Sequence, residues 1–141
     1  MRSAGDILYN FHWIVPGEAA RAAQAWAGFL TPFLKARGIR SIINLRGNNS
    51  DLSWWRYETR ATAAAGAVHL DAMLDSRRLP TRASLARLVE AFDTAPRPFL
   101  LKCSGGQDRT SFAAALYLVH RGGWGAMDAA MASASASSLR V

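Results

Sequence analysis

One eight-residue segment, Cys103–Thr110, constrains the fold more than any other part of the chain. It follows an apolar run over 98–102, contains two adjacent glycines and then an arginine, and leads into helical composition from Thr110 to His120. This order predicts a buried strand, a tight loop and the N-terminus of a helix. Backbone N–H groups of such a loop converge on one point, and the helix dipole adds positive potential there. The segment therefore predicts a binding site for a tetrahedral anion such as phosphate.

Two side chains give this anion site its expected chemistry. Arg109 can donate two parallel hydrogen bonds to anion oxygens, and the positive field favours the nucleophilic thiolate form of Cys103. The Thr110 hydroxyl is expected to hydrogen-bond the sulfur. A lone buried cysteine is usually a small apolar residue and a Gly-Gly pair is usually a turn, but neither role needs an arginine at this spacing. The loop residues expected to bind the anion are Ser104, Gly105, Gly106 and Gln107.

The segment resembles the Cys-x5-Arg-Thr signature of the cysteine-dependent phosphatases, and the similarity extends beyond it. Residues 10–17 together with Arg21 resemble the opening strands of the small atypical dual-specificity phosphatases. The stretch Gly38–Arg46 is similar to the GI-x-x-V-I-N-L-R strand of that group. The similarity runs from about Phe11 to Trp124. It implies a tyrosine phosphatase-like three-layer α/β fold and hydrolysis of phosphomonoesters through a cysteinyl-phosphate intermediate, without a cofactor.

The favoured function is a tyrosine or dual-specificity protein phosphatase. The alternative is a phosphoinositide or inositol phosphate phosphatase, because the Asp-Arg-Thr ending of the loop resembles bacterial lipid-and-tyrosine phosphatases and myotubularins. A catalytically weak phosphate-binding module and a rhodanese-like sulfurtransferase are disfavoured, since Cys103, Arg109 and Thr110 are all present at the phosphatase spacing. Lys102 differs from the pattern, because most members have a histidine there that orders the loop.

A phosphatase needs an acid to protonate the leaving oxygen, and three aspartates are candidates. Asp75 ranks first, because relatives place the acid on the loop after the strand over 67–70, and residues 75–80 are typical of an exposed loop. Asp108 ranks second, with the alternative role of holding the phosphate loop as an acceptor of backbone N–H groups. Asp71 ranks third, and its alternative role is to form a turn.

The turn after another predicted strand carries further candidates for substrate binding. Arg46, followed by residues 47–49, is expected to lie at the rim of the pocket. Trp54 or Trp55 is expected either to form an aromatic wall of the site or to pack in the core, and the two cannot both face the core.

Alternation of strand and helix patterns predicts an α/β fold with a mostly parallel central sheet flanked by helices. The ligand site should then lie at the carboxyl ends of the strands, where Cys103 is placed. The segment before Gly38 predicts either a short helix from Thr31 or a longer one from near Ala22. A last helix to about residue 132 is expected, followed by fraying over 133–141. The predicted strands cover 39–45, 67–70 and 99–103, and the predicted helices cover 52–65, 81–95 and 110–121.

Composition narrows the setting of the expected enzyme. The 141 residues suit one domain, 1–141, and half of them are apolar. A single cysteine excludes an internal disulfide and suits a reducing compartment, so a cytoplasmic location is expected. Three scattered histidines predict no metal site, and no apolar run approaches the roughly 20 residues of a membrane span. The net charge of +7 is spread along the chain, so no nucleic-acid partner is expected. The protein is expected to be a monomer.

Overall fold

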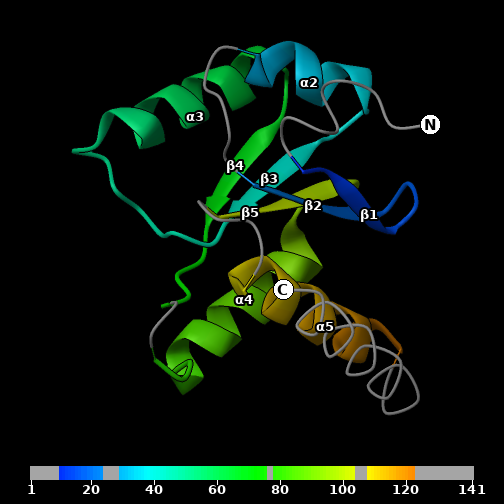
Figure 1. Ribbon diagram of the computed structural model, residues 1–141, viewed down its shortest axis with the longest axis vertical. Helices are drawn as coiled ribbons and strands as arrows, with labels where there is room; N and C mark the ends of the chain where they lie inside the picture. The colour runs from blue at the N-terminus through cyan, green and yellow to red at the C-terminus, as the bar shows by residue number, and fades with distance from the viewer. Residues whose placement is uncertain (1–9, 24–28, 76–77, 104–107, 123–141) are drawn as a thin grey trace.

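A computed structural model describes residues 10–23, 29–75, 78–103 and 108–122 of the chain. The described elements alternate between strands and helices after an opening hairpin (Figure 1). Their bounds are β1 (His12–Val15), β2 (Ala19–Ala23), α2 (Leu30–Ala36), β3 (Ser41–Asn44), α3 (Ser53–Ala64), β4 (Val68–Asp71), α4 (Arg82–Thr94), β5 (Phe99–Cys103) and α5 (Asp108–Gly122).

The five described strands form one sheet in the order β1-β2-β5-β3-β4. Only the β1–β2 pair is antiparallel, and β5 lies in the centre between the parallel strands β2 and β3. All five residues of β5 are buried, as expected for a continuous apolar strand covered on both faces. The predicted mostly parallel sheet is therefore confirmed, and it places Cys103 at the carboxyl end of its central strand.

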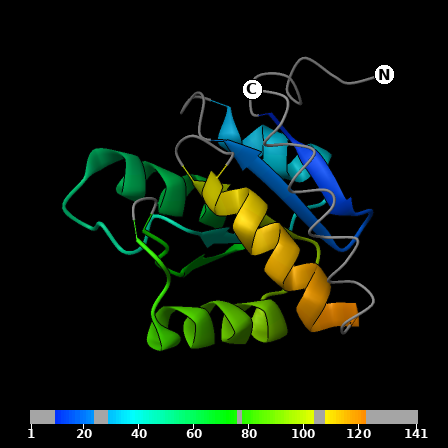
Figure 2. The same ribbon diagram turned by 60° about the horizontal axis from the view of Figure 1, so that its bottom comes forward.

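Helices cover both faces of the sheet, which gives a three-layer α/β architecture. α2 and α3 lie on one side, and α4 and α5 lie on the other (Figure 1; Figure 2). On the α4–α5 side, the rings of Phe92, Phe99 and Tyr117 pack together with centroids 5.0–5.9 Å apart. The second core, on the α2–α3 side, includes Phe33 and Ile42.

Local signals explain where several elements begin and end. Thr81 is the N-cap of α4, and its hydroxyl accepts a hydrogen bond from the Ser84 N–H at 3.1 Å, as predicted. Gly38 adopts a left-handed φ of +66° directly after α2, and the Ile39 N–H returns to the Leu34 carbonyl at 3.0 Å. The short-helix alternative for this segment is thus confirmed, and the longer helix from near Ala22 is wrong because Ala22 belongs to β2.

Two elements predicted for the C-terminal part of the chain lie outside the described residues. These are the last helix to about residue 132 and the frayed segment 133–141. Within the described ranges, no helix is both long and apolar enough to cross a membrane.

Candidate active site

The candidate nucleophile lies where the central strand ends and the longest described helix begins. Cys103 is the last residue of β5 and is 2% exposed, and α5 starts at Asp108. The predicted strand before the loop and helix after it are both present. The loop residues Ser104, Gly105, Gly106 and Gln107, and the side chain of Asp108, lie outside the described part of the chain.

Three arginines lie on elements that adjoin this strand end. Arg109 lies in the first turn of α5, Arg46 follows β3, and Arg21 lies on β2, next to β5. Burial lowers the pKa of Arg46 below its ordinary value, and so does the nearby charge of Arg109, whereas Glu58 and Cys103 raise it. Arg46 therefore lies within electrostatic range of both Arg109 and Cys103. Positive charge is therefore concentrated near the end of β5.

Arg21 was not among the site residues predicted from the sequence, where it was only part of a strand that resembles those of the phosphatases. Burial lowers the pKa of the Arg21 guanidinium, and Cys103 raises it, so the two groups interact. Arg21 also donates a hydrogen bond to Ser111 Oγ on α5 at 2.8 Å. The available signal was a single charged residue in the otherwise all-alanine strand Ala19–Ala23.

The turn that carries Arg46 is built by asparagines and a glycine. Asn44 accepts a hydrogen bond from the Arg46 N–H at 3.1 Å, and Asn49 donates to the Arg46 carbonyl at 3.0 Å. Gly47 has a φ of +79°, and a Cβ added there would lie 2.8 Å from Met73 Sδ. This close approach brings the segment after β4 against the Arg46 turn, where Arg46 and Met73 form an isolated bridge.

The two tryptophans of α3 have separate roles. Trp54 stacks on Arg46, with the guanidinium carbon 3.6 Å from the ring centroid, and its role as an aromatic wall of the site stays a prediction. Its Nε1–H is buried, and no acceptor is placed for it among the described residues. Trp55 instead donates its Nε1–H to both oxygens of Asp71, at 3.1 and 3.3 Å.

The structure separates the candidate acids by their surroundings. Asp71 accepts hydrogen bonds from Trp55 and from Asn44 Nδ2 at 2.9 Å, so its carboxylate is a fixed acceptor that joins β3, α3 and β4. Asp75 lies four residues further along, with a side chain 45% exposed and an oxygen 3.9 Å from Arg78 Nε. Asp75 is thus the accessible carboxylate of the two, and its role as the acid stays a prediction.

Thr110 and Lys102 flank the anion loop in the sequence but are buried in different places. Thr110 is fully buried in the first turn of α5, close to the end of β5, and its bond to the sulfur stays a prediction. Lys102 points to the opposite face of the sheet from Cys103, where its Nζ lies 2.6 Å from Glu58 Oε1. Lys102 and Cys103 are therefore buried on opposite sides of the same strand.

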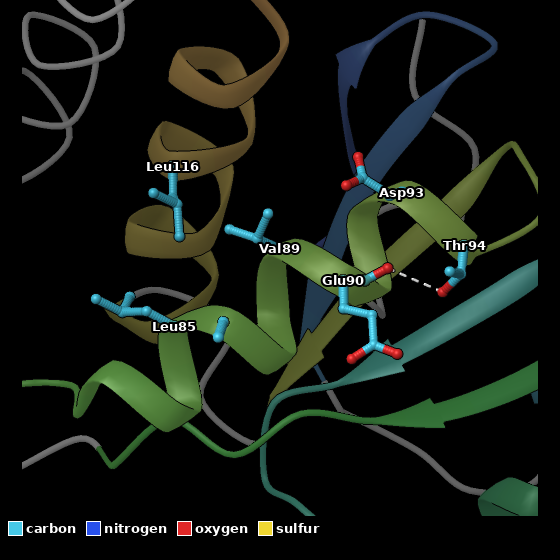
Figure 3. A pocket seen from close by; sticks show the side chains of 7 residues that line it. Leu85, Val89, Glu90, Asp93, Thr94 and Leu116 are labelled. Carbon is cyan, nitrogen blue, oxygen red and sulfur yellow. Dashed lines mark hydrogen bonds between the residues drawn. The ribbon is translucent and has the colours of Figure 1, made fainter.

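Two hollows in the described part of the chain lie away from the candidate catalytic residues. An apolar groove runs between α4 and α5, where Leu85 and Val89 face Leu116 (Figure 3). A polar recess on the same side is lined by residues such as Glu18 and Arg121. In the described ranges, no group of three histidine, cysteine or acidic residues is placed to bind a metal ion.

Comparison with known proteins gives the class of fold. No protein-family model matches the sequence, and no curated protein matches it. Among solved structures, TpbA from P. aeruginosa has a TM-score of 0.61 and 21% identity, covering 82% of this chain and 66% of TpbA. A cysteine-to-serine variant of TpbA in complex with pTyr has a TM-score of 0.62 and 20% identity, with coverages of 88% and 70%.

Two further structures share the fold. The core catalytic domain of the PP-IP phosphatase SIW14 from S. cerevisiae, in complex with citrate, has a TM-score of 0.55 and 17% identity, covering 75% of this chain and 62% of that domain. PTPMT1 has a TM-score of 0.61 and 20% identity, with coverages of 89% and 81%. The chain thus spans slightly less than two thirds of some of its structural relatives. It has the three-layer α/β fold of the atypical dual-specificity cysteine-based phosphatases.

Proposed function

We propose that the protein is a cysteine-dependent phosphomonoester hydrolase of the tyrosine or dual-specificity type. The observation that carries the proposal is the placement of Cys103 at the end of the central strand, within electrostatic range of Arg21 and Arg46 and below the helix that carries Arg109. A buried structural cysteine needs no cluster of arginines near it. A dianionic phosphoryl group would be attracted to such a cluster.

The proposed reaction has two steps. The Cys103 thiolate attacks phosphorus, the S–P bond forms as the P–O bond breaks, and Asp75 gives its proton to the departing oxygen. Water then attacks phosphorus, Asp75 takes the proton back, and the S–P bond breaks to release inorganic phosphate and the thiolate. Arg109 and the N–H groups of residues 104–107 would stabilise the charge on the equatorial oxygens. No cofactor enters either step.

A test of the proposal compares two substrates and one variant. We expect the protein to hydrolyse p-nitrophenyl phosphate and not to transfer sulfur from thiosulfate. The Cys103→Ser variant should lose turnover and still bind vanadate, because the serine hydroxyl is not ionised near neutral pH. Appreciable phosphatase activity of this variant would exclude the covalent mechanism. Vanadate binding without turnover by the wild type would indicate the phosphate-binding module instead.

The acid can be identified with leaving groups of different basicity. Asp75→Asn should slow phenyl phosphate much more than an activated aryl phosphate, because only the poor leaving group needs a proton. Asp71→Asn is the matched control, since Asp71 is a fixed acceptor of two side-chain donors. It should slow both substrates by the same factor. If Asp108→Asn alone shows the leaving-group dependence, the acid lies inside the phosphate loop.

A phosphoinositide or inositol phosphate substrate is the second candidate. Three arginines at one strand end suit a substrate with more than one phosphate, and SIW14, which shares the fold, is a PP-IP phosphatase. TpbA, in its serine variant, binds pTyr, which favours the first candidate. A panel of phosphopeptides and inositol phosphates, ranked by kcat/KM, decides between them.

A further inference from the structure

We infer that a buried polar network, Lys102–Glu58–His69–Asp71, positions the three segments that form the active site. The inference rests on the proposed phosphatase function. None of these four residues is assigned to touch the substrate, so they are positioning residues. The network begins at the residue before the nucleophile and ends at the turn that carries Arg46.

The first link is an ion pair buried beneath the sheet. Lys102 on β5 and Glu58 on α3 have side chains only 3% and 2% exposed, and Lys102 Nζ lies 2.6 Å from Glu58 Oε1. Removing two charges from water costs free energy that their attraction barely offsets, so two apolar side chains would pack there at least as well. The pair is therefore a poor stabiliser of the fold. The pair instead fixes the position of Lys102, and with it the end of β5 directly before Cys103.

The second link continues to β4, which lies beyond β3 in the sheet. The other oxygen of Glu58 lies 2.7 Å from His69 Nε2 on β4, and Asp71 follows His69 two residues further along the same strand. Burial raises the pKa of Glu58, but the hydrogen bond from His69 and the charge and hydrogen bond of Lys102 together bring it below its ordinary value. Glu58 is thus held as a carboxylate shared by two strands.

The third link reaches the site. Asp71 accepts from Asn44 Nδ2 at 2.9 Å, and the same Asn44 nitrogen donates to the Gly47 carbonyl at 2.9 Å. Asn44 Oδ1 in turn accepts the Arg46 N–H. The Lys102 carbonyl accepts a hydrogen bond from the Leu45 N–H at 2.7 Å, which connects the end of β5 to the residue after β3.

One connected network therefore joins the ends of β5, β3 and β4. These three ends lead to Cys103, to Arg46 and, through residues 72–75, to Asp75. A misplacement of about 1 Å between reacting groups can lower the rate about 100-fold. A network that fixes the relative positions of these groups therefore affects the catalytic rate.

The test uses a double variant that keeps the fold. Glu58→Gln/Lys102→Met removes both buried charges together and leaves an amide that can still bond His69, so its unfolding midpoint in urea should stay close to that of the wild type. Its kcat/KM on p-nitrophenyl phosphate should nevertheless fall by about 10- to 100-fold, mainly in kcat. The single variant Lys102→Met should show the same loss of activity, together with a lower urea midpoint.

Tyr117→Phe is the matched control on the other face of the sheet. It removes a comparable bond, because the buried Tyr117 hydroxyl donates to Glu18 Oε1 at 2.6 Å. This variant should keep kcat within about twofold of the wild type, because the bond that it removes is made to Glu18, which is not a candidate site residue. A double variant with wild-type stability and wild-type kcat would overturn the inference, because the pair would then be structural only.

A second measurement separates this inference from the proposed function. Cys103 is the only cysteine of the chain, so its alkylation by iodoacetamide is read directly by mass spectrometry. Inorganic phosphate should protect it in the wild type, and the double variant should need a several-fold higher phosphate concentration for half protection. If the wild type is protected but does not turn over substrate, the proposed hydrolysis fails and the positioning role is still measured. If phosphate protects the double variant as well as the wild type, or protects neither, the inference is wrong.

Discussion

The stack of Arg46 on Trp54 permits a quantitative test of how the site holds its substrate. The proposed contact of Arg46 with the phosphoryl group is a charge-assisted hydrogen bond, worth about 1.5–3 kcal/mol, and Arg46→Met would remove it. At about 1.4 kcal/mol per tenfold, kcat/KM should fall by roughly 10- to 150-fold. The side chain of methionine retains much of the apolar stem of arginine, so little packing is lost.

Trp54→Leu should act only through the arginine. The guanidinium lies 3.6 Å from the ring centroid at a partly buried position, which places the interaction at about 1–2 kcal/mol, between exposed and desolvated examples. Its Nε1–H has no acceptor among the described residues, so the substitution breaks no hydrogen bond seen there. The expected loss in kcat/KM is therefore about 5- to 30-fold.

The double variant decides whether the two residues act together. If Trp54 works by orienting Arg46, then Arg46→Met/Trp54→Leu should be no slower than Arg46→Met alone. Initial rates on p-nitrophenyl phosphate at 25 °C give all four kcat/KM values, and urea unfolding confirms that each variant is folded. Losses that simply multiply would refute the reasoning. Arg37→Met is the control, because Arg37 stacks on Phe33 at 3.9 Å on α2 and should leave kcat/KM unchanged.

Three further predictions concern the anion site, the core and pH. Arg109→Lys should raise the activation free energy that governs kcat/KM by about 2–4 kcal/mol, since an ammonium group cannot make two parallel hydrogen bonds. A variant with kcat/KM within tenfold of the wild type would contradict this. Phe92→Ala should lower the free energy of unfolding in urea by about 3–5 kcal/mol, whereas Phe29→Ala, at a 63% exposed position, should change it little. Burial and the bond to Glu18 raise the pKa of Tyr117 from 10.0 to about 12. Its stabilising contribution is complete below pH 10 and is lost as the pH rises through 12, so Tyr117→Phe should flatten the alkaline decline in urea stability, and an unchanged decline would contradict the assignment.

Local patterns predicted much of the fold because they act over a few residues. The apolar runs before Cys103 and after Gly38 gave two strands, and Thr81 marked the start of α4. β2 is the exception. Its sequence, Ala-Ala-Arg-Ala-Ala, has helical propensity, and it becomes a strand only because β1 and β5 pair with both of its edges. Tertiary pairing of this kind leaves no trace in a short window.

The candidate site likewise contains residues that the sequence predicts and residues that only the tertiary structure brings together. Cys103 and Arg109 are close in the sequence, so their spacing alone indicated an anion loop. Arg21 was missed because its approach to Cys103 depends on the pairing of two strands about 80 residues apart in the chain. The surroundings of Asp71 could not be predicted either, because its neighbours Asn44, Trp55 and His69 come from three different elements.

The order of the strands has a consequence for incomplete chains. Among the described strands, β5 is the last in the sequence and the middle one in space, so it alone joins the β1–β2 hairpin to the β3–β4 pair. A chain that stops before residue 99 would leave β2 and β3 with open edges that face no partner. Exposed edges of this kind pair with other molecules. Nascent or cleaved chains lacking β5 should therefore aggregate rather than persist as inactive, folded fragments.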